Sequence, residues 1–232
     1  MSKIKLFCIP HAGGSAAVYS KWKRYINTSI EICPIELAGR GSRFKEDLYN
    51  NINEAVEDVY NIIKNDLNNN YAFFGHSMGS LIAYELTYHI MKLKDKPPKH
   101  IFFSGRKAPN VIYENNSIHK LSEENLKNKV FEFSGTPKEV LDNVHMSNVF
   151  LKILRSDFKV CELYEYAKKD FKLDCNITIL NGNKDDIKIN HIVSWKQQTS
   201  KECCIYFFKG DHFYINNNIE SLAYIINSTL GI

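Results

Sequence analysis

Serine, aspartate and histidine residues that could work together in covalent catalysis lie in that order along the chain. Gly75-His76-Ser77-Met78-Gly79 fits the G-x-S-x-G pattern of a nucleophilic serine, and Asp185 and His212 follow much later. A serine hydroxyl is a weak nucleophile until an imidazole accepts its proton, and the imidazole needs a carboxylate that fixes its tautomer. The spacing therefore predicts Ser77 as nucleophile, His212 as base and Asp185 as the acid that orients the base.

The residues around Ser77 favour the strand-to-helix turn that this chemistry requires. Tyr71 to Phe74 form a short apolar run typical of a buried parallel strand, and apolar residues recur at helical spacing between Leu81 and Ile90. Glycines two positions to either side of Ser77 permit a turn too tight for larger side chains. The hydroxyl is then presented above the N-terminus of a helix, where the amide of Met78 can donate to a developing oxyanion.

A second oxyanion donor is expected in the loop Pro10-His11-Ala12-Gly13-Gly14-Ser15, which we call the Pro10–Ser15 loop. This loop follows an apolar strand at residues 3–10, and its glycines let backbone amides approach a ligand closely. We expect the amide of Ala12, or that of a residue next to it, to be the donor, and an ordinary glycine-rich turn is the alternative. His11 and His76 flank the two donors, so we expect them to pack or hydrogen-bond there instead of acting as the base.

The acid is expected in the loop that follows the strand at residues 177–180. The preceding loop, after the strand at 101–104, has no carboxylate close to the strand end. Asp185 and Asp186 both follow the later strand. Asp185 is favoured because it lies three residues beyond a glycine, and Asp186 stays the alternative, with a role as a solvated loop acid or helix cap.

The base is expected after the last strand, at residues 203–208. His212 follows that strand and a glycine, which is where the serine, acid, histidine order of the α/β-hydrolase fold places its histidine. His191 falls in the segment after Asp186 and is expected at the surface.

The rest of the chain alternates strands and helices as an α/β fold does. Strands are expected at residues 3–10, 30–35, 71–74, 101–104, 177–180 and 203–208, and helices at about 18–26, 53–67, 81–90 and 219–229. Between about 111 and 170 the alternation stops, and helices are expected at 121–133, 136–141 and 149–166. An insertion this long between two strands is interpreted as a helical lid. We therefore expect one domain over residues 1–232, an α/β-hydrolase fold with a mostly parallel sheet, helices on both faces and a lid insertion.

Composition limits the remaining functional classes. The chain has 232 residues, of which 44% are hydrophobic, enough for one substantial core. No stretch has the apolar length of a membrane span, and the first residues lead into a strand and not a signal peptide, so we expect a cytoplasmic protein without membrane association. The six cysteines have no metal-ligand spacing, and the net charge of +4 comes without a basic stripe. We expect no metal, no cofactor and no nucleic acid partner.

Three charged residues outside the proposed catalytic set have open interpretations. Arg40 and Arg43 lie in a glycine-bounded loop, where they could clamp an anion or a partner's acidic face, or simply hold the loop in place. Asp157 lies in an apolar stretch of the expected lid. It could form an ion pair with Arg155, Arg106 or Lys107, although a solvated helix face is the simpler interpretation.

Several motifs together resemble one family over nearly the whole chain. They are the Pro10–Ser15 loop with Ala16, Gly39-Arg40-Gly41-Ser42-Arg43, the Ser77 motif, Ser104-Gly105-Arg106-Lys107-Ala108-Pro109, Leu154-Arg155-Ser156-Asp157-Phe158 and Gly210-Asp211-His212-Phe213. The chain thereby resembles the type II thioesterases of nonribosomal peptide and polyketide synthesis. Family members often have Pro at the position of Ala38 and Gly at that of Asp211, so the match departs at those two positions.

The resemblance implies hydrolysis of acyl or aminoacyl thioesters on the phosphopantetheine arm of an acyl or peptidyl carrier protein. It also implies a monomer that meets its carrier transiently and clears stalled or wrongly primed modules. The alternatives are a small-molecule carboxylesterase or acyl-coenzyme A thioesterase, and a carrier-binding module that has lost the chemistry.

Overall fold

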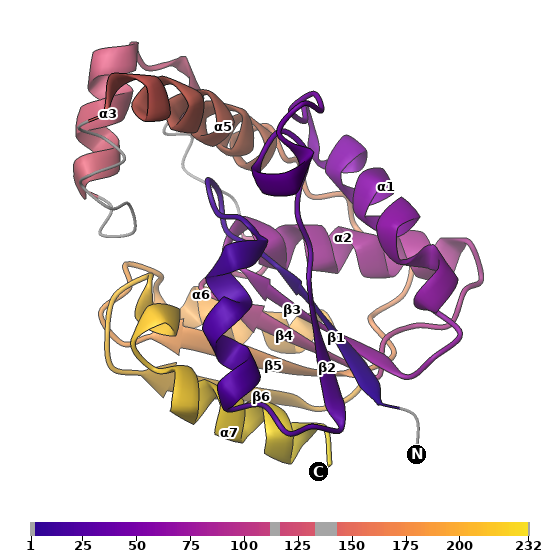
Figure 1. Ribbon diagram of the computed structural model, residues 1–232. Coiled ribbons are helices and arrows are strands. Elements are labelled where there is room, and N and C mark those ends of the chain that lie inside the picture. The colour runs from indigo at the N-terminus through magenta and orange to yellow at the C-terminus, as the bar shows by residue number, and fades with distance from the viewer. Residues whose placement is uncertain (1–2, 112–116, 133–142, 232) are drawn as a thin grey trace.

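The fold is built on one parallel sheet (Figure 1). The computed structural model describes residues 3–111, 117–132 and 143–231. Within those residues the sheet has six strands in the order β2-β1-β3-β4-β5-β6, and every neighbouring pair is parallel. The strands are β1 (Ile4–Ile9), β2 (Ile30–Pro34), β3 (Tyr71–His76), β4 (His100–Ser104), β5 (Asn176–Gly182) and β6 (Cys203–Phe208). The expected α/β-hydrolase fold is confirmed.

The register brings the carboxyl ends of the strands together at one edge. Gly75 of β3 pairs with Ile9 of β1, and Ser104 pairs with both His76 and Leu180 on its two sides. Because parallel strands all end at the same edge, the loops after β1, β3, β4, β5 and β6 meet there.

Helices cover both faces of the sheet because alternate side chains of each strand point to opposite sides. On β1, Phe7 and Ile9 pack with residues of α1 (Ile52–Ile63) and α2 (Met78–Lys92). Leu6 and Cys8 pack on the other face with the 3₁₀ helix Ala16–Arg24 and with α7 (Ile219–Thr229) (Figure 1). The described helices include none with the length and apolarity to cross a bilayer.

The first helical segment differs from the expected α-helix at 18–26. It is a 3₁₀ helix at Ala16–Arg24, with Tyr19 and Trp22 fully buried against Phe74 of β3. A 3₁₀ helix repeats every three residues, so side chains three apart lie on the same line. This spacing places both aromatic rings on the sheet, with ring centroids 5.1 Å from each other.

The insertion between β4 and β5 contains α3 (Glu123–Glu132) and α5 (Val144–Glu162), which pack against each other (Figure 1). We call this pair of helices the lid, after the expectation from the sequence; the last turns of α5 also join the main core through Val160. The expected helix at 136–141 lies outside the described residues. The expected helix at 149–166 begins earlier, because the Asn143 side chain accepts the Met146 amide at 3.0 Å and caps it. It also ends earlier, and the Tyr164 hydroxyl beyond it hydrogen-bonds Glu85 of α2. A short α6 (Ile189–Val193) follows β5.

Candidate active site

Ser77 occupies the sharp turn between β3 and α2. Its φ of 54° and ψ of −111° lie in a region that non-glycine residues rarely adopt, and its amide donates to the Ser104 carbonyl at 2.8 Å. A Cβ at Gly75 would lie 2.3 Å from the Gly79 carbonyl oxygen, and one at Gly79 would lie 2.1 Å from that of Ile9. The two glycines of the motif are therefore required by backbone contacts, and the strained serine is typical of a nucleophile position.

His212 and Asp185 are joined by a hydrogen bond across the ends of β5 and β6. Nδ1 of His212 lies 2.8 Å from Oδ2 of Asp185. Because a carboxylate only accepts, the proton is assigned to Nδ1, which leaves Nε2 as the atom able to take a proton from a nucleophile. The Asp185 side chain is 7% exposed, whereas Asp186 is exposed to solvent. The geometry favours Asp185 over Asp186 as the partner of this histidine.

Glycines let the loops around His212 approach one another. A Cβ at Gly105, which has a φ of +60°, would lie 2.6 Å from Cε1 of His76 and 3.3 Å from Cε1 of His212. The His76 and His212 rings themselves have centroids 5.1 Å apart. Since Ser77 directly follows His76, these contacts bring His212 to the strand end that carries the serine.

His76 is held by a buried chain of hydroxyl groups. Its Nδ1 lies 2.8 Å from Oγ of Ser104, which lies 2.6 Å from the Tyr214 hydroxyl. Burial, and secondarily the neighbouring rings of His212 and His11, lowers the pKa of His76 well below its ordinary value. His76 therefore stays neutral and adds no positive charge that would oppose protonation of His212.

His11 lies on the opposite side of this cluster of rings. Its Nδ1 hydrogen-bonds the Ala12 carbonyl at 2.9 Å, and its ring meets that of Phe213 edge-on at a centroid distance of 5.1 Å. Burial lowers the pKa of His11. His11 and His76 are thus packing and hydrogen-bonding residues, as the sequence predicts.

Two amides of the Pro10–Ser15 loop, those of Gly13 and Gly14, make structural hydrogen bonds. The Gly13 amide donates to Oδ2 of Asp157 at 2.7 Å, and the Gly14 amide donates to the His11 carbonyl at 2.9 Å. Among hydrogen bonds between described residues, the amides of Ala12 and Met78 donate none. These two are the amides that the sequence predicts as oxyanion donors.

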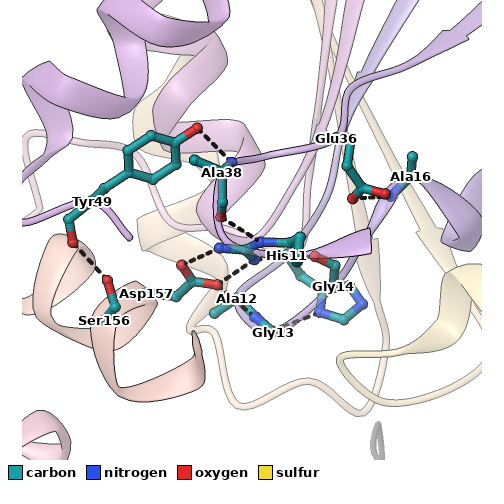
Figure 2. Close-up of polar contacts among 11 residues, drawn as sticks. His11, Ala12, Gly13, Gly14, Ala16, Glu36, Ala38, Tyr49, Ser156 and Asp157 are labelled. Carbon is teal, nitrogen blue, oxygen red and sulfur yellow. Dashed lines mark hydrogen bonds and ion pairs between the residues drawn. The ribbon is translucent and has the colours of Figure 1, made fainter. Parts of the chain in front are cut away.

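Asp157 of α5 forms a buried ion pair with Arg40. The two guanidinium nitrogens Nη1 and Nη2 donate to the two carboxylate oxygens at 2.7 and 2.8 Å, and the side chains are 3% and 0% exposed. Arg40 Nη1 also donates to the Gly14 carbonyl at 3.1 Å. The expectation of a solvated helix face at Asp157 was wrong, and so were the cations suggested for it. The carboxylate lies where the lid meets the Pro10–Ser15 loop (Figure 2).

Arg43 also holds its own loop. It makes a bidentate ion pair with Asp58 of α1 at 2.7 and 2.8 Å and a further pair with Glu46. Both arginines therefore have internal partners, so the structural interpretation of these residues is correct and the anion clamp is not supported.

Sequence reasoning missed the link between the lid and the Pro10–Ser15 loop. Arg40 and Asp157 are separated by 117 positions, and the signal was their presence in two of the motifs that carry the family resemblance. The Ser104 and Tyr214 hydroxyls behind His76 were also missed, and no pattern in the sequence distinguishes them from other buried polar residues.

Comparison with known proteins identifies the family. The family model described as a thioesterase domain matches residues 4–230. The gramicidin S biosynthesis protein GrsT of Aneurinibacillus migulanus is 37% identical over 92% of this chain and 84% of its own length. The protein named linear gramicidin dehydrogenase LgrE of Brevibacillus parabrevis is 34% identical over 99% of this chain and 88% of its own.

A solved structure shows the same likeness in three dimensions. ClbQ from the colibactin nonribosomal peptide and polyketide synthesis pathway is 31% identical, with a TM-score of 0.94 over 99% of this chain and 97% of its own. The chain therefore belongs to the thioesterase family, with homologues among the type II thioesterases of nonribosomal peptide and polyketide synthesis.

Proposed function

We propose that this thioesterase hydrolyses acyl or aminoacyl thioesters carried on the phosphopantetheine arm of acyl or peptidyl carrier proteins. Ser77 is the nucleophile, His212 the base, Asp185 the acid that orients it, and the amides of Ala12 and Met78 are the oxyanion donors. The observation that carries the proposal is the 2.8 Å hydrogen bond between Asp185 and His212, at the strand edge where Ser77 occupies its strained turn. The proposal treats residues 1–232 as one catalytic domain with its lid insertion at about 111–170.

Hydrolysis proceeds in two steps on these groups. Nε2 of His212 removes the proton from the Ser77 hydroxyl as the oxygen attacks the thioester carbon, and the two amides stabilise the oxyanion. The C–S bond then breaks, and the departing thiolate takes the proton from His212. A water molecule, deprotonated by His212, attacks the resulting serine ester and releases the carboxylic acid and Ser77.

Carrier-bound substrates are supported by the biosynthetic settings of the relatives. Gramicidin S biosynthesis and the colibactin nonribosomal peptide and polyketide pathway appear in the names of a sequence relative and a structural neighbour. An enzyme with this role acts as a monomer that meets its carrier transiently and removes groups that block a synthetase. The alternative is an enzyme whose substrates are not attached to a carrier protein, either a small-molecule carboxylesterase or an acyl-coenzyme A thioesterase.

A fluorophosphonate probe tests the catalytic assignment. The wild type should be labelled at Ser77, and the Ser77→Ala variant should not be labelled. Absence of labelling in the wild type, or equal labelling of both proteins, would contradict the catalytic assignment of Ser77, and absence of labelling would favour a non-catalytic carrier-binding module.

A comparison of thioester carriers tests the substrate class. A holo carrier protein is loaded with acetyl, aminoacyl or longer acyl groups, and kcat/KM is compared with that for the same groups on free coenzyme A. The carrier-bound forms should be preferred, and a preference for the free thioesters would exclude the editing role.

A further inference from the structure

The peptide unit between Ala12 and Gly13 is held at both ends. Its carbonyl oxygen accepts from Nδ1 of His11 at 2.9 Å, and its N–H donates to Oδ2 of Asp157 at 2.7 Å. Gly13 has a φ of +76°, so its own backbone preference does not fix this orientation. The Ala12 N–H, the proposed donor, belongs to the preceding peptide unit, which is joined to this one at the Ala12 Cα. Fixing the Ala12–Gly13 unit therefore restricts the direction of that N–H, and one of the two bonds that fix it comes from an acceptor on α5.

The same face of α5 packs directly on Gly13. A Cβ at Gly13 would lie 3.0 Å from side-chain atoms of both Phe150 and Leu154. Residues 150, 154 and 157 follow one another at spacings of four and three, which places them on one side of the helix. The apolar contacts with Gly13 and the hydrogen bond to its amide thus come from a single face of α5. Figure 2 shows Asp157 beside Gly13.

Arg40 fixes the carboxylate that accepts the Gly13 amide. Its planar guanidinium binds both oxygens of Asp157 and also the Gly14 carbonyl, so it orients the carboxylate and the loop together. A buried ion pair is weak evidence of a role in stability, since apolar residues of similar volume often replace one at little cost. The role of the Arg40–Asp157 pair is better explained by the backbone of the Pro10–Ser15 loop, which it holds in place.

We propose that Asp157 is a positioning residue for the oxyanion hole, through which the lid helix α5 sets the orientation of the Ala12 amide. When α5 is seated on the Pro10–Ser15 loop, the Gly13 amide has its acceptor and Ala12 is fixed. When α5 moves away, the acceptor is withdrawn, so lid closure and assembly of the oxyanion hole are one event. This inference rests on the proposed function of the Ala12 amide.

Two double variants that differ only in whether position 157 has an acceptor test the proposal. Arg40→Met with Asp157→Asn removes both charges and keeps a side-chain oxygen for the Gly13 amide. Arg40→Met with Asp157→Leu removes the charges and the acceptor. Arg40→Met with Asp157→Met is a second acceptor-free variant, used if the leucine variant unfolds at a lower urea concentration than the asparagine variant.

Kinetics with a short acyl thioester of pantetheine provide the readout. The acceptor-free variant should lose about 10- to 100-fold in kcat relative to the asparagine variant, less than the roughly 100- to 1,000-fold cost of removing an oxyanion donor outright, because the Ala12 amide is misdirected and not removed. KM should change by less than about threefold. An alkyl boronic acid, whose Ser77 adduct has an anionic oxygen, should lose affinity in parallel. Equal kcat and equal boronate affinity in the two variants would overturn the proposal.

The proposed function fails in a distinguishable way. If the Ser77→Ala variant hydrolyses the pantetheine thioester as fast as the wild type, the catalytic assignment is wrong before any double variant is compared. If hydrolysis depends on Ser77 and the double variants behave alike, only the role of Asp157 is wrong.

Discussion

Asp185 accepts a 2.8 Å hydrogen bond from Nδ1 of His212, although 27 positions separate the two residues and each follows a different strand. Gly182 makes this approach possible, because a Cβ there would lie 2.1 Å from the Asp211 carbonyl oxygen. The neighbouring Asp186 is exposed to solvent. Its substitution is therefore a matched control for that of Asp185.

Substitution of each aspartate in turn should show which of the two is the catalytic acid. We expect Asp185→Asn to lower kcat by about 10⁴-fold, because an amide no longer holds His212 in the tautomer that accepts a proton. Asp186→Asn should change kcat by less than about twofold. Steady-state kinetics on an acyl-pantetheine thioester, with unfolding midpoints to verify folding, measure both. Equal losses in the two variants would contradict the assignment of Asp185.

Gly105 should tolerate no side chain, because a Cβ there would crowd the rings of both His76 and His212. The Gly105→Ala methyl would lie 2.6 Å from one ring and 3.3 Å from the other, at a φ of +60°. We expect kcat to fall at least about tenfold as His212 is displaced, since small misplacements of a catalytic group are costly. Gly231→Ala is the matched control, because it also has a positive φ but nothing within 4 Å of the new methyl. A Gly105→Ala enzyme with wild-type kcat would show that this contact does not position His212.

The parts of this site that could be predicted from sequence are those set by local backbone rules and by sheet topology. Gly75 and Gly79 predict the turn at Ser77, because only glycine fits between the backbone segments that meet there. Asp185 and His212 could be associated because parallel strands bring their following loops to one edge.

The parts that could not be predicted depend on how the lid packs on the loops at the edge of the sheet. Asp157 has basic neighbours in sequence, yet its partner is Arg40, which is brought to it by the packing of α5 on a distant loop. The beginning of α5 was also placed too late, because a cap by Asn143 outweighs the weaker apolar pattern that follows it.

The buried pair of Arg40 and Asp157 should show strong coupling in folding stability. Either Arg40→Met or Asp157→Leu alone leaves a buried charge unpaired and should cost about 3–5 kcal/mol of unfolding free energy. The double variant should lie much nearer to wild type than the sum of the two losses, as urea denaturation can measure.

The exposed pair of Lys201 and Asp174, 3.0 Å apart, is the control for that cycle. Its side chains are 52% and 63% exposed, so water and salt screen the attraction. Removing either member should cost less than about 1 kcal/mol. Additive losses at Arg40 and Asp157, similar in size to those of the exposed pair, would contradict the picture of a desolvated ion pair.

His100 should make the fold sensitive to mild acid. It lies buried in β4, where Nε2 hydrogen-bonds Oγ1 of Thr178 at 2.9 Å, and burial lowers its pKa to about 4. In the unfolded chain the pKa is near the ordinary value of about 6.5, so below that pH the unfolded state binds a proton that the folded state does not. Stability contributed by this residue is complete above pH 6.5 and is lost as the pH falls towards 4.

The expected loss at pH 5 is about 2 kcal/mol relative to pH 8, since each pKa unit corresponds to about 1.4 kcal/mol. His100→Gln keeps a group that can hydrogen-bond Thr178 but does not titrate, so its stability should decline less over the same range by about that amount. Urea denaturation at several pH values measures the difference, and the pH 8 comparison isolates any packing defect because the imidazole is neutral there in both states. An unchanged pH dependence in the variant would mean that other groups cause the acid sensitivity; His76, which is also buried and held neutral, would be the first to test.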